Sequence, residues 1–431
     1  MRLVSASLLA ALVAAVPSVA AAQAGAGLRP GIPPEGEVDA FGNPVVVVPR
    51  PTEEDDPYAP LGIRAGGLLL FPALTTTFGY NSNVDAAPGG AGAAFGVLVP
   101  ELLIQSDWAR HEATVRLAGE YDQTFDGSAG SPSGEAEATL RIDHADGWWT
   151  DLGAGYIYSQ QSSTDPDFPV GADQSPGLHG LAASAAFSGR TGGRGVFTVE
   201  GSVDRAMYED ATAGGVPVDQ SDRNNTAFTA RLRAGYEVTP SLTPFVEVAV
   251  SRSLFDRTID NDGLARSSTG HALRAGVAID RDPFLSGEVA IGYAEERFDD
   301  PTLAALGVLT FEGSLVWAPT ELTTVTFNGA TSLEPSADPA SSGSVVYDGS
   351  VDLAYAWRRN VTLTGTAGAT QERHQGTGLV DTNYSAGFNA TWRMNRTHHF
   401  TAGYEHEWQE STDPTRAYQA DVVRVELRMQ R

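Results

Sequence analysis

The chain contains neither cysteine nor lysine. The absence of cysteine excludes a disulfide framework and a thiolate metal site. Because lysine is absent, all 28 basic residues are arginine, which stays charged and can hold a carboxylate through two hydrogen bonds. The 54 acidic residues outnumber them and give a formal net charge of -26, so we expect no nucleic-acid partner.

An apolar run stands near the N-terminus, and no later segment predicts a transmembrane helix. Leu3–Val16 is apolar, and Pro17 separates it from a stretch of small residues. This run is shorter than the roughly 20 residues that a membrane-spanning helix needs, although an uncleaved anchor is the alternative. The pattern predicts a signal peptide at 1–22, with cleavage after residue 22 or 24. Because the chain is predicted to be exported and has no cysteine, we expect it in the periplasm or the outer membrane.

Residues 23–64 form a second region, rich in proline and in acidic side chains. The stretches 27–36 and 49–57 carry most of its prolines. This composition predicts an extended periplasmic segment without a packed core. Residues 27–57 are the candidate contact for a periplasmic partner.

From residue 65 to 431 the sequence alternates between apolar and polar residues. In 112–121, Val115 and Leu117 would share one face of a strand, and Arg116 and Glu120 the other. About eighteen such segments predict an all-β fold, a transmembrane antiparallel up-and-down β-barrel of about 18 strands, with 16 as the alternative. We expect strands near 67–80, 94–107, 112–124, 135–147, 150–159, 177–189, 195–207, 226–238, 242–253, 270–281, 284–297, 308–317, 322–333, 345–357, 360–372, 382–394, 398–408 and 418–430.

Short and long connections alternate between these segments. Thr191-Gly192-Gly193 is a tight turn, whereas 160–176 and 209–225 are long and polar. Outer-membrane barrels keep their short turns on the periplasmic side, and an even strand number then leaves both the N- and C-termini in the periplasm. A soluble sandwich would have shorter strands, and a propeller blade would place four strands in each repeat rather than two.

Six of the seven tryptophans lie within a few residues of a short turn. Because tryptophan is enriched at membrane interfaces, they predict a periplasmic aromatic belt. The predicted belt consists of Trp108, Trp148, Trp149, Trp317, Trp357 and Trp392.

Charged residues of both signs are spread over the alternating segments. An arginine on the lipid face would cost about 2–4 kcal/mol at the bilayer midplane, so we assign the charged face to the lumen. The predicted lumen-facing residues are Glu112, Arg116, Glu120, Arg141, Asp143, Arg231, Arg233, Glu288, Asp352, Arg393, Glu405, Arg424 and Arg428. So wide a barrel holds water unless loops plug it.

The most specific motif opens the barrel at 58–72 and continues as Phe78-Gly79-Tyr80-Asn81-Ser82-Asn83-Val84. It resembles the proteobacterial family named "putative beta-barrel porin 2", outer-membrane barrels of which some are associated with capsule or exopolysaccharide loci. The resemblance implies a porin-like or polysaccharide-related role and carries over no catalytic residues. Outer-membrane barrels usually end in an aromatic residue, whereas this chain ends at Arg431. As partners we expect outer-membrane lipid, lipopolysaccharide and the barrel assembly machinery.

The chain has no motif for catalysis or metal binding. No histidine has metal-ligand spacing, and we interpret His398-His399 as a polar turn pair, since neighbours on a strand face opposite ways. No nucleophile or phosphate-loop motif occurs. The acidic loops offer oxygens for Ca²⁺, but they lack calcium-loop spacing, so solvated surface is the preferred interpretation. We expect no cofactor, no metal and no enzymatic activity.

Three functions follow as hypotheses. The charged lumen favours a porin-like passive diffusion channel in the outer membrane of a Gram-negative bacterium, and the acidic excess favours cations. In this hypothesis the loop at about 160–176 folds inward as a constriction. The alternative is a structural or secretion-accessory barrel for surface polysaccharide, in which 27–57 contacts a periplasmic partner. An outer-membrane hydrolase is the third, although no catalytic set converges in the sequence.

Overall fold

The computed structural model describes residues 56–127, 130–145, 147–161, 168–169, 171–281, 283–334, 336 and 341–431. The expected signal peptide at 1–22 and most of the expected segment 23–64 lie outside these residues.

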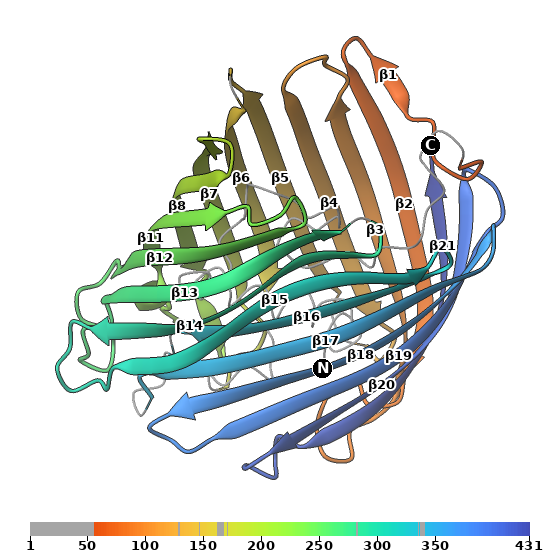
Figure 1. Cartoon of the computed structure of the whole chain (residues 1–431). Coiled ribbons are helices and arrows are strands. Elements are labelled where there is room, and N and C mark those ends of the chain that lie inside the picture. The colour runs from red at the N-terminus through yellow and green to blue at the C-terminus, as the bar shows by residue number, and fades with distance from the viewer. Residues whose placement is uncertain are drawn as a thin grey trace.

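Eighteen long antiparallel strands form one sheet that curves into a barrel (Figure 1). They are β2 (Leu68–Asn81), β3 (Ala93–Ser106), β4 (Glu112–Thr124), β5 (Ser131–Asp143), β6 (Trp148–Gln160), β7 (Gly177–Thr191), β8 (Gly195–Tyr208), β11 (Asn225–Tyr236), β12 (Leu242–Phe255), β13 (Ser268–Arg281), β14 (Leu285–Phe298), β15 (Leu306–Thr320), β16 (Thr323–Glu334), β17 (Gly343–Arg358), β18 (Val361–Gln375), β19 (Val380–Arg393), β20 (His398–Ser411) and β21 (Tyr418–Gln430). Short strands β9 (Ala211–Ala213) and β10 (Val216–Val218) and the 3₁₀ turn η2 (Ser221–Arg223) lie in the connection between β8 and β11.

The barrel is closed, because its last strand pairs with its first. β2 and β21 are antiparallel from Ala73↔Gln430 to Asn81↔Val422. The short strand β1 (Ile63–Ala65) pairs with the part of β2 that β21 does not reach. The fold prediction is therefore confirmed with 18 strands, not 16. Closure gives each barrel strand two neighbours, as a lipid environment requires.

The period-2 pattern locates these strands closely in the sequence. The predicted 112–124 and 418–430 coincide with β4 and β21. The largest difference is at β5, predicted at 135–147 and observed at Ser131–Asp143. Between β7 and β8, Gly192 and Gly193 have φ angles of 60° and 88°, which residues with a Cβ rarely adopt. Glycine is therefore what permits this tight turn.

The connections between strands are short at one end of the barrel and mostly longer at the other. We name these ends the short-turn rim and the long-loop rim. The connection 376–379 is an exception, since it lies at the long-loop rim and is as short as a tight turn. At the short-turn rim, the Asp107 N–H donates to the Gly67 carbonyl at 2.9 Å, and the Gln430 N–H donates to the Thr397 carbonyl at 3.0 Å. Both ends of the barrel sequence thus lie at the short-turn rim.

Among the described residues, no helix is long and apolar enough to cross a membrane.

Candidate functional site: the inner wall of the barrel

Residues alternate between the two faces of each strand, and ion pairs identify the inner face. On β12, Val248 and Val250 are each 48% exposed, whereas Glu247 is 4% exposed. Arg233 of β11 binds Glu288 of β14 at 2.6 Å, across two intervening strands. Side chains converge over such a span only on the concave face of a curved sheet. The charged face of these strands therefore lines the lumen, and the valines face outward.

The largest group of inner-wall charges lies on β8 and β11–β15, and we call it the arginine network. It contains three arginines and four glutamates, namely Arg231, Arg233, Arg274, Glu200, Glu247, Glu288 and Glu312. Glu247 is central, since Arg274 lies 2.8 Å and Arg231 3.6 Å from its carboxylate. Because opposite charges are paired, this sector presents little net field to the lumen.

A second group joins the strands on both sides of the barrel closure. Arg428 of β21 reaches over β2 and donates to Glu101 of β3. Arg116 of β4 lies 3.6 Å from the same Glu101 and 3.5 Å from Glu135 of β5. These ion pairs connect the end of the barrel sequence to its beginning.

A third group lies on β19–β21. Arg424 binds Glu405 at 2.9 Å and donates to Asn389 Oδ1 at 3.1 Å, across β20. Nearer the short-turn rim, Arg393 binds Asp56 at 2.7 Å. Arg393 thus holds the first described residue of the chain against the barrel.

The other predicted lumen residues of β4 and β5 lie on the same strand faces as these groups. Glu120 shares the inner face of β4 with Arg116. Arg141 donates to Asp143 at 3.1 Å. Glu112, which pairs in register with Arg141, is exposed at the short-turn rim. Glu112, Arg141 and Asp143 therefore lie toward the pore entrance at the short-turn rim.

The inner face in the middle of β16–β18 is different, because among the described residues it carries carboxylates and hydroxyls but no arginine. We call Asp348 and Asp352 the acidic strip. Asp348 accepts a hydrogen bond from Thr370 Oγ1 at 2.7 Å. The neighbouring hydroxyl residues on this face are Thr324, Thr326, Ser350, Thr362, Thr364 and Thr366. This sector presents a net negative charge to the lumen.

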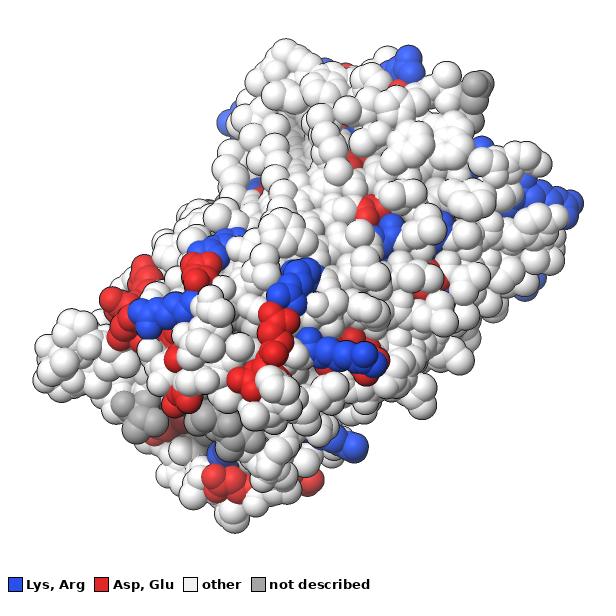
Figure 2. Space-filling view, turned by 90° about the vertical axis from the view of Figure 1, so that its left-hand side faces the viewer, with Lys and Arg blue, Asp and Glu red and all other residues white. Residues whose placement is uncertain are grey.

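The outer wall has an apolar band that ends at charged pairs. On β12 the band extends from Leu242 to Arg252, a length of about 26 Å for a strand tilted by about 40°, which is close to the apolar height of membrane barrels. Arg252 binds Asp299 at 2.6 Å, and its hydrogen bonds hold the pKa of that carboxyl below its ordinary value. Figure 2 shows charged pairs gathered on the lower left of one face, beside a broad area with little charge.

Four of the six predicted belt tryptophans are exposed near the short-turn rim, namely Trp108, Trp317, Trp357 and Trp392. Trp148 stacks on Phe187, with ring centroids 5.0 Å apart. Trp149 is a correction to the predicted belt, because it faces the lumen and the Arg141 guanidinium lies 4.8 Å from its ring centroid. Consecutive residues of a strand face opposite sides, so Trp148 and Trp149 cannot both belong to an outer belt.

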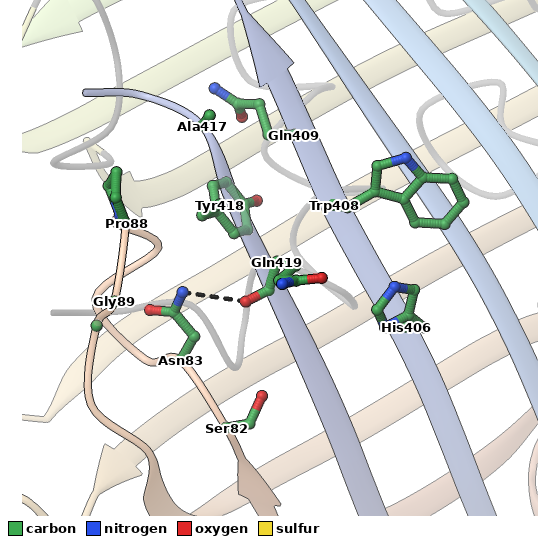
Figure 3. A pocket seen from close by; sticks show the side chains of 11 residues that line it. Ser82, Asn83, Pro88, Gly89, His406, Trp408, Gln409, Ala417, Tyr418 and Gln419 are labelled. Carbon is green, nitrogen blue, oxygen red and sulfur yellow. Dashed lines mark hydrogen bonds between the residues drawn. The ribbon is translucent and has the colours of Figure 1, made fainter. Parts of the chain in front are cut away.

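A pocket of about 680 Å³ lies at the long-loop rim beside the closure of the barrel (Figure 3). Asn83 stands on one side, where its Nδ2 donates to the Gln419 carbonyl at 3.0 Å. His406 and Trp408 of β20 lie on the other side. Asn83 belongs to the motif at 78–84, so this part of the motif ties β2 to β21.

Two features could not be matched between the sequence and the structure: a predicted constriction that lies partly outside the described residues, and three buried residues that the sequence did not single out. Of the expected constriction at 160–176, residues 162–167 and 170 lie outside them. Arg266, Leu333 and Val345 received no role, yet they are 5%, 4% and 5% exposed. Alternation gave no signal for their burial. Within the part of the chain that the structure describes, no group of three His, Asp or Glu residues could hold a metal ion.

The family model described as "Putative beta-barrel porin 2" matches residues 56–431. No curated protein matches the chain. Solved structures similar to it include the outer membrane protein OpdK from Pseudomonas aeruginosa, at 9% identity and a TM-score of 0.43 over 84% of this chain and 98% of that one. OccAB4 from Acinetobacter baumannii has 10% identity and a TM-score of 0.44 over the same shares, 84% and 98%.

The FrpB iron transporter from Neisseria meningitidis (F3-3 variant) has 10% identity and a TM-score of 0.42 over 79% of this chain. The chain covers 62% of the length of that transporter. At such identities the likeness concerns the fold alone.

Proposed function

The chain belongs to the "Putative beta-barrel porin 2" family, and from this membership and its inner wall we propose that it is a porin-like passive diffusion channel that prefers cations. Its place is the outer membrane of a Gram-negative bacterium, with the short-turn rim and both ends of the barrel in the periplasm. In this proposal the chain has no catalytic role.

The acidic strip is the observation that carries the cation preference. Asp352 has no ion-pair partner among the described residues, and Asp348 is hydrogen-bonded to a neutral hydroxyl. Fixed carboxylates on a pore wall lower the energy of a passing cation and raise that of an anion. The arginine network cannot offset this effect, since its four glutamates outnumber its three arginines.

Ion selectivity in planar bilayers tests the proposal. With a KCl gradient across the bilayer, the reversal potential should indicate a preference for K⁺ over Cl⁻. The double variant Asp348→Asn/Asp352→Asn should bring the permeability ratio closer to one. Asp421→Asn is the matched control, because Asp421 binds Tyr404 and His406 rather than belonging to the acidic strip.

Two results would count against the proposal. Anion preference, or a double variant with unchanged selectivity, would remove the role of the acidic strip. No conductance from correctly folded protein would refute the channel itself.

Whole-cell labelling tests the orientation. A peptide tag inserted in the connection 412–417 should be accessible on intact cells, and the same tag in 394–397 should not be. The opposite pattern would place the long-loop rim in the periplasm.

A further inference from the structure

The end of the β16–β17 hairpin is buried on a side that should face outward. The register of the two strands is unbroken along their whole length. By the period of two, Leu333 and Val345 share a face with Phe327 and Val351, which are each 40% exposed. Leu333 and Val345 are nevertheless only 4% and 5% exposed. Some other part of the chain must therefore cover this face.

The cover is the inner wall of the barrel. Leu333 and Val345 belong to one apolar cluster with Ala249, Ala272, Ala294 and Leu306. These four residues lie on the lumen faces of β12, β13, β14 and β15, on the same sides as the arginine network. The outward side of the hairpin end thus packs against the inward side of four other strands, which places the hairpin end within the lumen.

The pairing of β15 with β16 shows how this arrangement arises. It extends from the short-turn rim only as far as Glu312↔Ala330. Beyond that pair, β15 remains bound to β14 up to Leu306, while β16 remains bound to β17. The sheet parts between β15 and β16, and the hairpin end passes to the inner side of β15.

A buried arginine from a distant loop holds the hairpin end in this position. Arg266, in the connection 256–267, donates from Nη1 to the carbonyls of Ser336 and Ser341, the latter at 3.3 Å. Its Nε donates to Asp260 Oδ2 at 2.6 Å. Arg266 and Asp260 have side chains that are 5% and 8% exposed. Because the carboxylate satisfies the buried charge, the guanidinium can remain buried beside the hairpin.

We infer that residues 331–334 and 341–347 form a fixed constriction of the pore, and that Arg266 is the residue that positions it. This inference rests on the proposed channel function. Eighteen strands about 4.8 Å apart and tilted by about 40° give a barrel about 36 Å across. The overlap with β12–β15 covers about 14 Å of the wall and adds a layer about 10 Å thick. Allowing for side chains, the hairpin end removes roughly a quarter of the open cross-section.

Cysteine labelling tests the position of the hairpin end without any measurement of transport. The chain has no cysteine, so a single introduced thiol reports on one place. Val345→Cys should be protected from both lipid-soluble and water-soluble maleimides. Leu353→Cys is the matched control, because Leu353 lies on the same face of β17 and is 43% exposed. Equal reactivity at the two positions would overturn the inference.

Single-channel conductance tests the constriction. Arg266→Ala should release the hairpin end and raise the conductance by about a third, in proportion to the cross-section regained. Arg257→Ala is the control, since Arg257 lies in the same connection but is 39% exposed and pairs with Asp219. Val345→Asp is a second route, because a carboxylate is not tolerated in the apolar cluster.

The outcomes separate the two proposals. If the wild type conducts and neither Arg266→Ala nor Val345→Asp changes its conductance, the constriction is refuted and the channel is retained. If the wild type does not conduct, the channel proposal fails and the constriction with it, while the labelling still locates the hairpin end.

Discussion

Replacing Glu247 with glutamine removes the carboxylate that three arginines share. Arg274, Arg231 and Arg233 lie 2.8, 3.6 and 4.0 Å from it. The side chains of Arg274 and Arg231 are only 3% and 8% exposed, so water cannot replace the lost charge. Removing one partner of a buried ion pair costs about 3–5 kcal/mol when the other charge is left uncompensated. Each arginine keeps one other carboxylate, so we expect a loss of about 2 kcal/mol in the free energy of unfolding.

Urea unfolding in phospholipid vesicles, followed by tryptophan fluorescence, measures this loss. The matched control is Glu295→Gln, because Glu295 pairs with Arg297, whose side chain is 73% exposed. An exposed pair contributes about 0.2–1 kcal/mol at most, so the control should change stability little. Equal losses in the two variants would refute the reasoning, since they would mean that burial adds nothing to the pairs on the inner wall.

Three further predictions concern the barrel closure, the Arg266 loop and the two faces of the wall. Asn83→Ala removes the hydrogen bond to the Gln419 carbonyl, so it should lower the free energy of unfolding by about 1 kcal/mol and speed hydrogen exchange in β21. Unchanged exchange in β21 would contradict the role of Asn83 at the barrel closure. Burial raises the pKa of Asp260, but hydrogen bonds from the Leu264 N–H and from Arg266 outweigh it and lower the pKa below its ordinary value. The stability from this carboxylate is therefore present above the unfolded pKa of about 4 and is lost as the pH falls through the lower folded value. Hydrogen exchange in 256–267 should increase in that acidic range in the wild type but not in Asp260→Asn, and a shared pH profile would argue against the assignment. Brominated lipid should quench the fluorescence of a variant that retains only Trp357, which is 55% exposed, and not of one that retains only Trp149; similar quenching would place Trp149 outside the lumen.

Local sequence predicted most of the fold because a strand has a fixed period. Charged residues such as Arg231 and Glu288 could be assigned to one face, since side chains two apart point the same way. The same period could have corrected the belt, as Trp148 and Trp149 are adjacent. The period gives no information, however, on which charged residues of different strands form ion pairs. Arg233 and Glu288 meet across two strands only because the sheet is curved, and curvature is a property of the closed barrel.

The amino-acid sequence by itself determined the approximate positions of the strands and their two faces, and closure of the barrel decided between 18 strands and 16. The positions and the faces follow from interactions between near neighbours in the chain or from the alternation along a single strand. Only the tertiary structure decided that the end of the β16–β17 hairpin lies within the lumen. Leu333 and Val345 have the alternation of outward residues, and the pattern is the same whether lipid or another part of the wall covers them. What covers them depends on where β15 and β16 part and on Arg266, which reaches the hairpin from a loop between β12 and β13.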